Sequence, residues 1–111
     1  MVSALGIGTM RFKGRENAAE MIERELELGL TYCDIGSAYS YKAFDDNAEA
    51  WVGEAIAGKD RSKMVISAKA QPRQGEPQVD KGLGINSRDQ MAQCIENSLK
   101  RVGVGHFDFY Q

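Results

Sequence analysis

Short apolar runs that alternate with amphipathic helical stretches constrain the fold of this chain most. The runs have the length of buried strands, and they lie at residues 4–8, 30–35, 64–68 and 107–110. Between them, apolar side chains recur at helical spacing over residues 17–28, 47–57 and 87–102. This β-α-β-α-β-α-β order predicts parallel strands joined by right-handed crossovers.

The predicted helix ends carry their own signals. Asn47 is expected to cap the second helix, and Gly29 and Gly58 are expected to end the first and the second. Ser87 to Gln90 form a capping box that opens the third helix. The apolar face predicted for that helix consists of Met91, Ile95, Leu99 and Val102. The segment 71–86 predicts a long polar loop, and loops of this length are often functional.

Two architectures fit this alternation of predicted strands and helices. One is an open, doubly wound sheet, and the other is part of a closed (β/α)₈ barrel. A complete barrel of this kind needs about 250 residues, and this chain has 111. A partial barrel would leave its first and fourth strands without neighbours, so we expect self-association or pairing with a second half through these open sheet edges.

Composition excludes several classes of function. The net charge is −2 and no basic patch stands out, so no nucleic-acid partner is expected. No apolar run approaches the roughly 20 residues of a membrane span, and the N-terminal stretch does not resemble a signal peptide. The two cysteines, Cys33 and Cys94, lack metal-site spacing. We therefore expect a cytoplasmic protein without a metal and without a membrane association.

Residues with useful chemistry follow the predicted strands. Asp34 ends the second strand and Lys69 follows the third, while Tyr39 lies on the loop after Asp34. The carboxyl ends of parallel strands share one edge, so Asp34 and Lys69 are expected to meet. A lysine cation beside a phenol stabilises the phenolate, and a phenol in that setting can act as a general acid. Each residue alone is more often a cap or a surface charge.

Several motifs occur in an order typical of one family. The first is LGIGTM around the first strand, and the second is the D-x₄-Y spacing from Asp34 to Tyr39. Three further segments follow: 47–56 (NAEAWVGEAI), 65–69 (VISAK), and 98–111, which contains SLKRVG and FDFYQ. In this order the chain resembles the N-terminal half of an aldo-keto reductase. The resemblance implies a partial (β/α)₈ TIM barrel, with about four parallel strands and three helices in one domain over residues 1–111.

The resemblance also implies a catalytic tetrad of Asp, Tyr, Lys and His. Carried over, Tyr39 is the proton donor, Lys69 stabilises its phenolate, and Asp34 holds Lys69. The family cofactor is NADP(H), and the residues expected to line its site are Gly8, Thr9, Met10 and Asp34. The implied substrate is a small-molecule aldehyde or ketone that is reduced to an alcohol.

Some features depart from the family pattern. The family histidine would lie just beyond Gln111, and His106 precedes the fourth strand, so it is not a substitute. The isolated chain is therefore expected to be an inactive fragment, or alternatively a non-enzymatic half-barrel that serves as a scaffold or a partner-binding subunit. A third interpretation is an aldolase that forms a Schiff base on Lys69. Only the spacing favours Tyr39 over Tyr41 as the acid.

Overall fold

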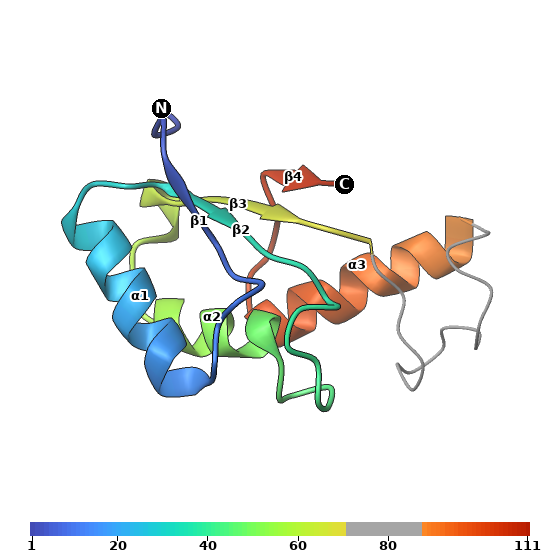
Figure 1. Cartoon of the computed structure of the whole chain (residues 1–111). Helices are drawn as coiled ribbons and strands as arrows, with labels where there is room; N and C mark the ends of the chain where they lie inside the picture. Colours follow the sequence, from blue (N-terminus) through green and yellow to red (C-terminus); the bar gives the residue numbers. More distant parts are fainter. Residues whose placement is uncertain (71–87) are drawn as a thin grey trace.

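The computed structural model describes residues 1–70 and 88–111, and in them helices follow strands in the predicted order (Figure 1). The strands are β1 (Gly6–Gly8), β2 (Tyr32–Asp34), β3 (Val65–Ala68) and β4 (Phe109–Tyr110). The helices are α1 (Arg15–Glu27), α2 (Ala48–Ile56) and α3 (Arg88–Val102), with a 3₁₀ helix at Arg61–Lys63. The loop predicted over 71–86 and residue Ser87 of the capping box lie outside the described residues.

The sheet has the strand order β1-β2-β3-β4, and every neighbouring pair is parallel. The three helices lie on one side of these strands (Figure 1), and α2 packs against both α1 and α3. An open doubly wound sheet reverses its strand order and carries helices on both faces. Sequential order with one helical layer is instead the arrangement of a (β/α)₈ barrel wall.

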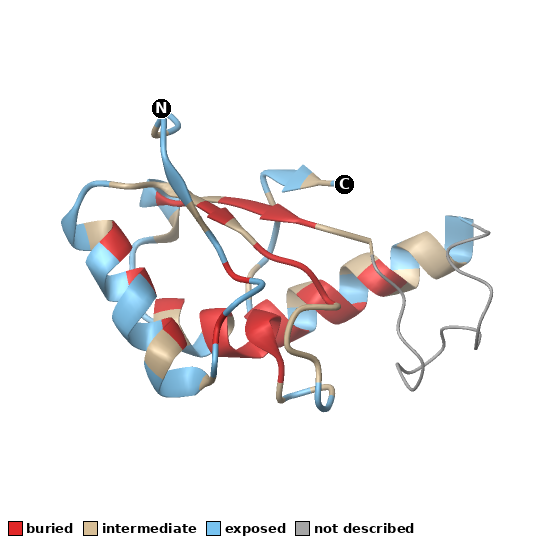
Figure 2. Ribbon diagram, in the orientation of Figure 1, coloured by how far each residue is buried: buried red, intermediate tan, exposed pale blue. Residues whose placement is uncertain are grey.

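The hydrophobic core lies between the sheet and the helical layer. Buried residues concentrate on β2, β3 and α2, whereas β1 and β4 are largely exposed (Figure 2). The largest fully buried apolar side chains are Trp51, Ile22, Ile35, Ile66 and Val52. The central strands are therefore covered by helices, and the outer strands have a neighbour on one side only within the described part of the chain.

The predicted helix ends are confirmed for α1 and α2. The Asn47 side chain accepts a hydrogen bond from the Ala50 amide at 3.0 Å, which satisfies one of the free amides of the first turn. Gly29 and Gly58 have φ angles of 72° and 76°, the left-handed conformation that a C-terminal glycine supplies. The first helix begins at Arg15, two residues before the predicted start at 17.

The apolar face predicted for α3 is only partly buried. Met91, Ile95 and Leu99 are only half-buried, and of the predicted set Val102 alone is fully buried. The buried residues of α3 are Cys94, Asn97, Ser98, Arg101 and Val102. Arg101 pairs with Glu49 on α2, and Gly53 approaches the Val102 carbonyl so closely that a Cβ atom would come within 2.6 Å of it. These two contacts fix the rotation of α3 about its axis, and they turn a largely polar side of the helix toward α2.

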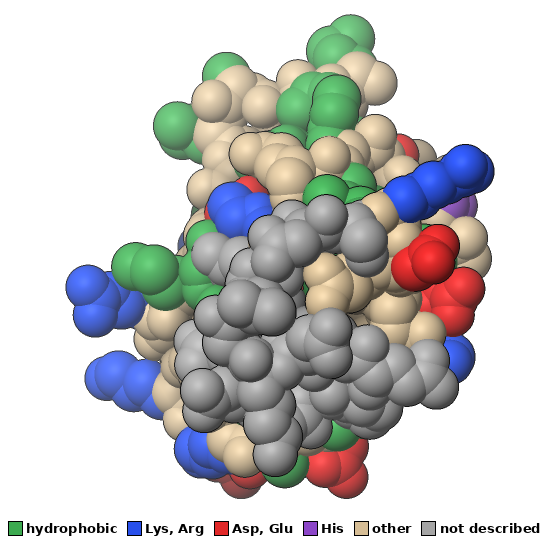
Figure 3. All heavy atoms as spheres, turned by 90° about the vertical axis from the view of Figure 1, so that its right-hand side faces the viewer, with side chains coloured by type: hydrophobic (Ala, Val, Ile, Leu, Met, Phe, Trp, Pro, Cys, Tyr) green, Lys and Arg blue, Asp and Glu red, His purple; other side chains and the backbone are tan. Residues whose placement is uncertain are grey.

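Several large apolar side chains remain exposed, and they include Met1, Val2, Leu5 and Phe109. Figure 3 shows hydrophobic side chains gathered at the top of the molecule, which is the end that carries the N-terminus in Figure 1. Within the described residues, no helix is both long enough and apolar enough to cross a membrane.

Candidate functional site

The candidate site begins with the alignment of the strand ends. The parallel register places Gly8 beside Asp34 and Asp34 beside Ser67. Thr9, which follows β1, donates two hydrogen bonds to the Asp34 carbonyl, from its amide and from its Oγ1, both at 3.1 Å. The backbone of Asp34 is therefore fixed between its neighbours, and its carboxylate stands at the carboxyl edge of the sheet.

Asp34 and Lys69 meet at this edge, as the sequence predicts. Lys69 Nζ donates to Asp34 Oδ1 in an ion pair whose side chains are 23% and 28% exposed. Burial lowers the pKa of Lys69, but the hydrogen bond and charge of Asp34 and the nearby Tyr39 outweigh this effect. The net result is a pKa above the ordinary value of 10.5, so the amine stays protonated.

Tyr39 completes the group from the loop between β2 and α2. Lys69 Nζ lies 5.5 Å from the centroid of the Tyr39 ring. The Tyr39 amide donates to the Gly36 carbonyl, and the Tyr39 carbonyl accepts from the Ala48 amide, both at 3.0 Å. The structure thus brings together the three residues that were predicted to act on the substrate.

The four residues expected near a cofactor differ in accessibility. A Cβ atom added to Gly8 would meet no atom of the described residues within 4 Å, so they leave the space at this strand end open. Met10 is 52% exposed, whereas Thr9 is buried and its hydroxyl is engaged by Asp34. Gly8 and Met10 are therefore accessible at this edge, whereas Thr9 holds the strand ends together.

Two further polar residues at this edge were not identified from the sequence. Gln111 follows β4, and its side-chain amide donates to Ser67 Oγ at 2.8 Å. Ser67 is paired with Asp34 in the register and lies two residues before Lys69. This position in the third strand is the sequence signal that could have identified Ser67, because residues paired with Asp34 face the same side of the sheet.

His106 lies away from this group, at the other end of β4. It is exposed, and its carbonyl accepts a hydrogen bond from Arg61 at 3.3 Å. Among residues 1–70 and 88–111, no three His, Cys, Asp or Glu side chains cluster in a way that could hold a metal ion.

Comparison with known proteins supplies the family context. The sequence matches the Aldo/keto reductase family model over residues 4–111. It is 28% identical over 120 residues to the uncharacterized oxidoreductase YrpG of Bacillus subtilis (strain 168), covering 99% of this chain and 36% of that protein. It is also 28% identical over 122 residues to protein tas of Escherichia coli (strain K12), covering 99% and 34%. The chain thus spans about a third of the length of these relatives.

A solved structure shows the same fold. The crystal structure of a thermostable aldo-keto reductase, Tm1743, in complex with the inhibitor epalrestat matches this chain with a TM-score of 0.72 at 23% sequence identity. The match covers 98% of this chain and 37% of that one. Together with the strand order, it confirms the prediction of a partial (β/α)₈ barrel.

Proposed function

Since this chain belongs to the aldo/keto reductase family, we propose that it carries the proton-transfer residues of an NADP(H)-dependent oxidoreductase that reduces aldehydes or ketones to alcohols. The observation that supports this most is the junction of Asp34, Lys69 and Tyr39 at the carboxyl edge of the sheet. This edge is where the reacting groups of (β/α)₈ barrels lie.

In this proposal Tyr39 donates a proton to the carbonyl oxygen of the substrate. Loss of that proton creates a phenolate, which the adjacent Lys69 ammonium stabilises. Asp34 holds Lys69 in place and keeps it protonated, in accord with its raised pKa. The hydride would come from a reduced nicotinamide bound against Gly8, Met10 and the Asp34 carboxylate, where the strand ends are open.

The Schiff-base alternative is less well supported by the same geometry. A lysine must be neutral to attack a carbonyl. Lys69 is paired with Asp34, and its pKa is raised, so the nucleophilic form is rare at neutral pH. Trapping of a carbonyl substrate on Lys69 with borohydride would favour an aldolase over a reductase.

A non-enzymatic half-barrel is the second candidate function. It is supported by the exposure of β1 and β4 and of nearby apolar side chains such as Leu5 and Phe109. Exposed apolar surface beside open sheet edges promotes association. We propose that the isolated chain self-associates or pairs with a partner through these edges. Light scattering that finds a monodisperse monomer, with a cooperative calorimetric transition, would contradict this candidate.

The reductase proposal is tested by Tyr39→Phe in a reconstituted barrel that contains this sequence. We expect turnover to fall by about 10² to 10⁴, the usual contribution of a general acid, while the affinity for NADPH is unchanged. Tyr41→Phe is the matched control, because it removes a neighbouring phenol from the same loop. Near-normal turnover in the Tyr39 variant, with loss in the Tyr41 variant, would transfer the role to Tyr41.

A further inference from the structure

The loop that carries Tyr39 is tied to the connection before it in the chain. We call residues 9–14, between β1 and α1, the first connection, and residues 35–47, between β2 and α2, the second connection. Thr9 donates to the carbonyl of Asp34, just before the second connection begins, and the Phe12 carbonyl accepts from Ser40 Oγ at 2.9 Å. These ties hold the chain on both sides of Tyr39.

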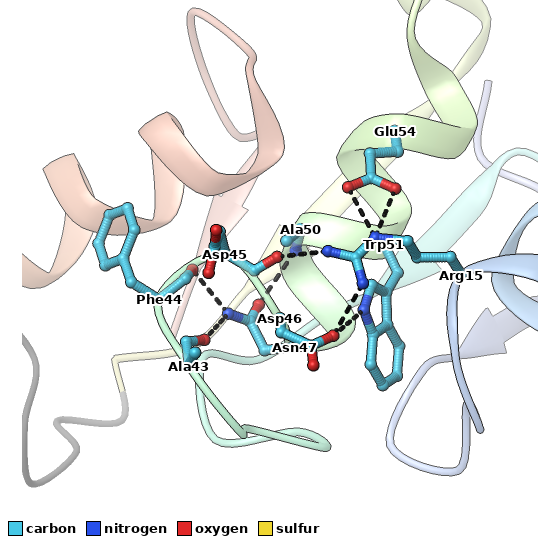
Figure 4. A network of polar contacts seen from close by, with 9 residues as sticks. All are labelled: Arg15, Ala43, Phe44, Asp45, Asp46, Asn47, Ala50, Trp51 and Glu54. Atoms are coloured by element: carbon cyan, nitrogen blue, oxygen red, sulfur yellow. Dashed lines mark hydrogen bonds and ion pairs between the residues drawn. The ribbon is translucent and has the colours of Figure 1, made fainter.

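A third tie lies at the far end of the second connection, where Arg15 reaches across from the start of α1 (Figure 4). Arg15 Nη1 donates to Asp46 Oδ1 at 3.0 Å, and Nη2 donates to the Asp45 carbonyl at 2.8 Å. Its Nε donates to the carboxylate of Glu54 on α2. One guanidinium therefore joins the start of α1 and the last turn of α2 to the end of the second connection.

Asp46 is the residue on which these contacts converge. Besides Arg15, its Oδ1 accepts from Trp51 Nε1 at 2.9 Å. Its carbonyl accepts from the amides of Lys42 and Ala43 at 2.9 and 3.2 Å, and its amide donates to the Ala43 carbonyl. The hydrogen bond from Trp51, together with the charges of Lys42 and Arg15, holds the pKa of Asp46 below its ordinary value despite partial burial.

The contacts of Asp46 close the loop that begins at Tyr39. Beyond Asp46, the Asn47 side-chain amide donates to the carbonyls of Ala43 and Phe44, both at 2.8 Å. The next residue, Ala48, donates its amide to the Tyr39 carbonyl. Ser40, next to Tyr39, has a φ of 50°, a conformation that a non-glycine residue keeps only where its surroundings hold it. Displacement of Asp46 would therefore loosen one of the constraints on the loop that carries Tyr39.

We propose that Asp46 and Arg15 form a clamp that positions the Tyr39 hydroxyl against Lys69 for proton transfer. The inference rests on the proposed reductase function and adds two positioning residues to it. Proton transfer depends steeply on placement, and a shift of about 1 Å can slow catalysis about 100-fold. Both clamp residues lie outside the group of Asp34, Tyr39 and Lys69, and they act through the backbone of the second connection.

The variants that test the clamp are Asp46→Ala and Arg15→Met, with Asp45→Ala as the matched control. Asp45 is adjacent and has the same charge, but it contacts Arg15 through its backbone carbonyl, which alanine retains. The indole N–H signal of Trp51, the single tryptophan of the chain, reports whether the hydrogen bond to Asp46 is lost. If Asp46→Ala fails to fold, Arg15→Met opens the clamp from a side chain that is 49% exposed.

Two measurements test the clamp and the reductase function separately. In the labelled 111-residue chain, we expect nuclear Overhauser effects between the Tyr39 ring and the Lys69 side chain to weaken in the two clamp variants and to persist in Asp45→Ala. In a reconstituted barrel, we expect kcat to fall about 10- to 100-fold in the clamp variants with an unchanged affinity for NADPH.

The outcomes distinguish the two hypotheses. A shifted Trp51 signal in Asp46→Ala with unchanged contacts between Tyr39 and Lys69 would overturn the clamp and leave the reductase function standing. A reconstituted wild-type barrel that reduces no carbonyl substrate would overturn the function. In that case the Tyr39–Lys69 contacts still decide whether Asp46 and Arg15 position the tyrosine.

Discussion

Two ion pairs in this molecule have the same chemistry and opposite surroundings. Asp34 and Lys69 meet at the carboxyl edge of the sheet, with side chains 28% and 23% exposed. Glu49 on α2 and Arg101 on α3 meet between the two helices at 2.6 Å, and both side chains are 0% exposed. A pair at an open edge can be reached by substrate and water, whereas a pair without solvent contact acts on the fold alone.

The buried pair is held by its surroundings as well as by its charges. The Arg101 guanidinium lies 5.1 Å from the centroid of the Phe44 ring and donates to Ser98 Oγ at 3.3 Å. Removing two charges from water is unfavourable, and good geometry is needed to offset it. We infer from this that the pair selects the orientation of α3 more than it adds stability.

The largest effect on stability is expected where one partner of the buried pair is removed. Glu49→Gln leaves the Arg101 charge buried without its carboxylate, which destabilises a fold by about 3–5 kcal/mol. Urea unfolding followed by circular dichroism measures the change. The double variant Glu49→Met with Arg101→Met is the control, and it is expected to recover most of the loss because no charge remains buried. A single variant as stable as the wild type would contradict the prediction, because it would show that an unpaired Arg101 charge is not destabilising at this position.

A third carboxylate extends the comparison because it is buried and forms no ion pair with any of the described residues. Glu25 on α1 is 3% exposed, and neither of its oxygens has a hydrogen-bond partner of normal geometry among the described residues. Burial raises the pKa of Glu25 to about 7, against a smaller opposing effect of the Ile7 backbone. The folded state therefore binds this proton more tightly than the unfolded state does.

The sign of the pH dependence follows from that difference. Stability is greatest below the unfolded pKa of 4.5 and falls as the pH rises to about 7. The total loss is up to about 3 kcal/mol. Glu25→Gln should remove this dependence and be more stable than the wild type at pH 8, as measured by urea unfolding at pH 5 and pH 8. Glu20→Gln, at an exposed position of the same helix, should leave the dependence intact, and equal pH profiles for all three proteins would contradict the prediction.

The open pair could be predicted from the sequence and the buried pair could not. Asp34 ends one recognisable strand and Lys69 follows the next, and parallel topology brings the carboxyl ends of neighbouring strands together. No side-chain geometry was needed for that inference. The family motifs then indicated Tyr39, because the D-x₄-Y spacing is local.

The pair of Glu49 and Arg101 spans 52 positions and depends on how α3 is rotated about its axis. The apolar spacing of Met91, Ile95 and Leu99 predicted a different rotation, because periodicity ranks side chains by hydrophobicity and ignores pairing between helices. The clamp of Arg15 and Asp46 was missed for a related reason. An exposed charge at the start of α1 and a partly buried one at the end of the second connection carry no periodic signal that would join them.

The smallest effect on stability is expected at the site itself. Lys69→Met removes a pair that water already screens in part, so we expect a loss of about 1 kcal/mol or less in urea unfolding. The contribution of Lys69 is present below its ordinary pKa of 10.5, and it is lost as the pH rises through the raised folded-state pKa. Near neutral pH the wild type therefore retains this contribution in full.

The same substitution should have a large effect on chemistry. In a reconstituted barrel, Lys69→Met leaves the phenolate that proton transfer creates on Tyr39 without its cation, so carbonyl reduction should be strongly slowed or lost. Lys59→Met, at an exposed position, is the control for loss of a lysine charge. A stability loss of 3 kcal/mol or more in Lys69→Met would place the open pair in the same class as Glu49 and Arg101. A small loss of stability with a large loss of turnover would show that the pair of Asp34 and Lys69 is kept for proton transfer, in contrast to the pair of Glu49 and Arg101, which is kept for the fold.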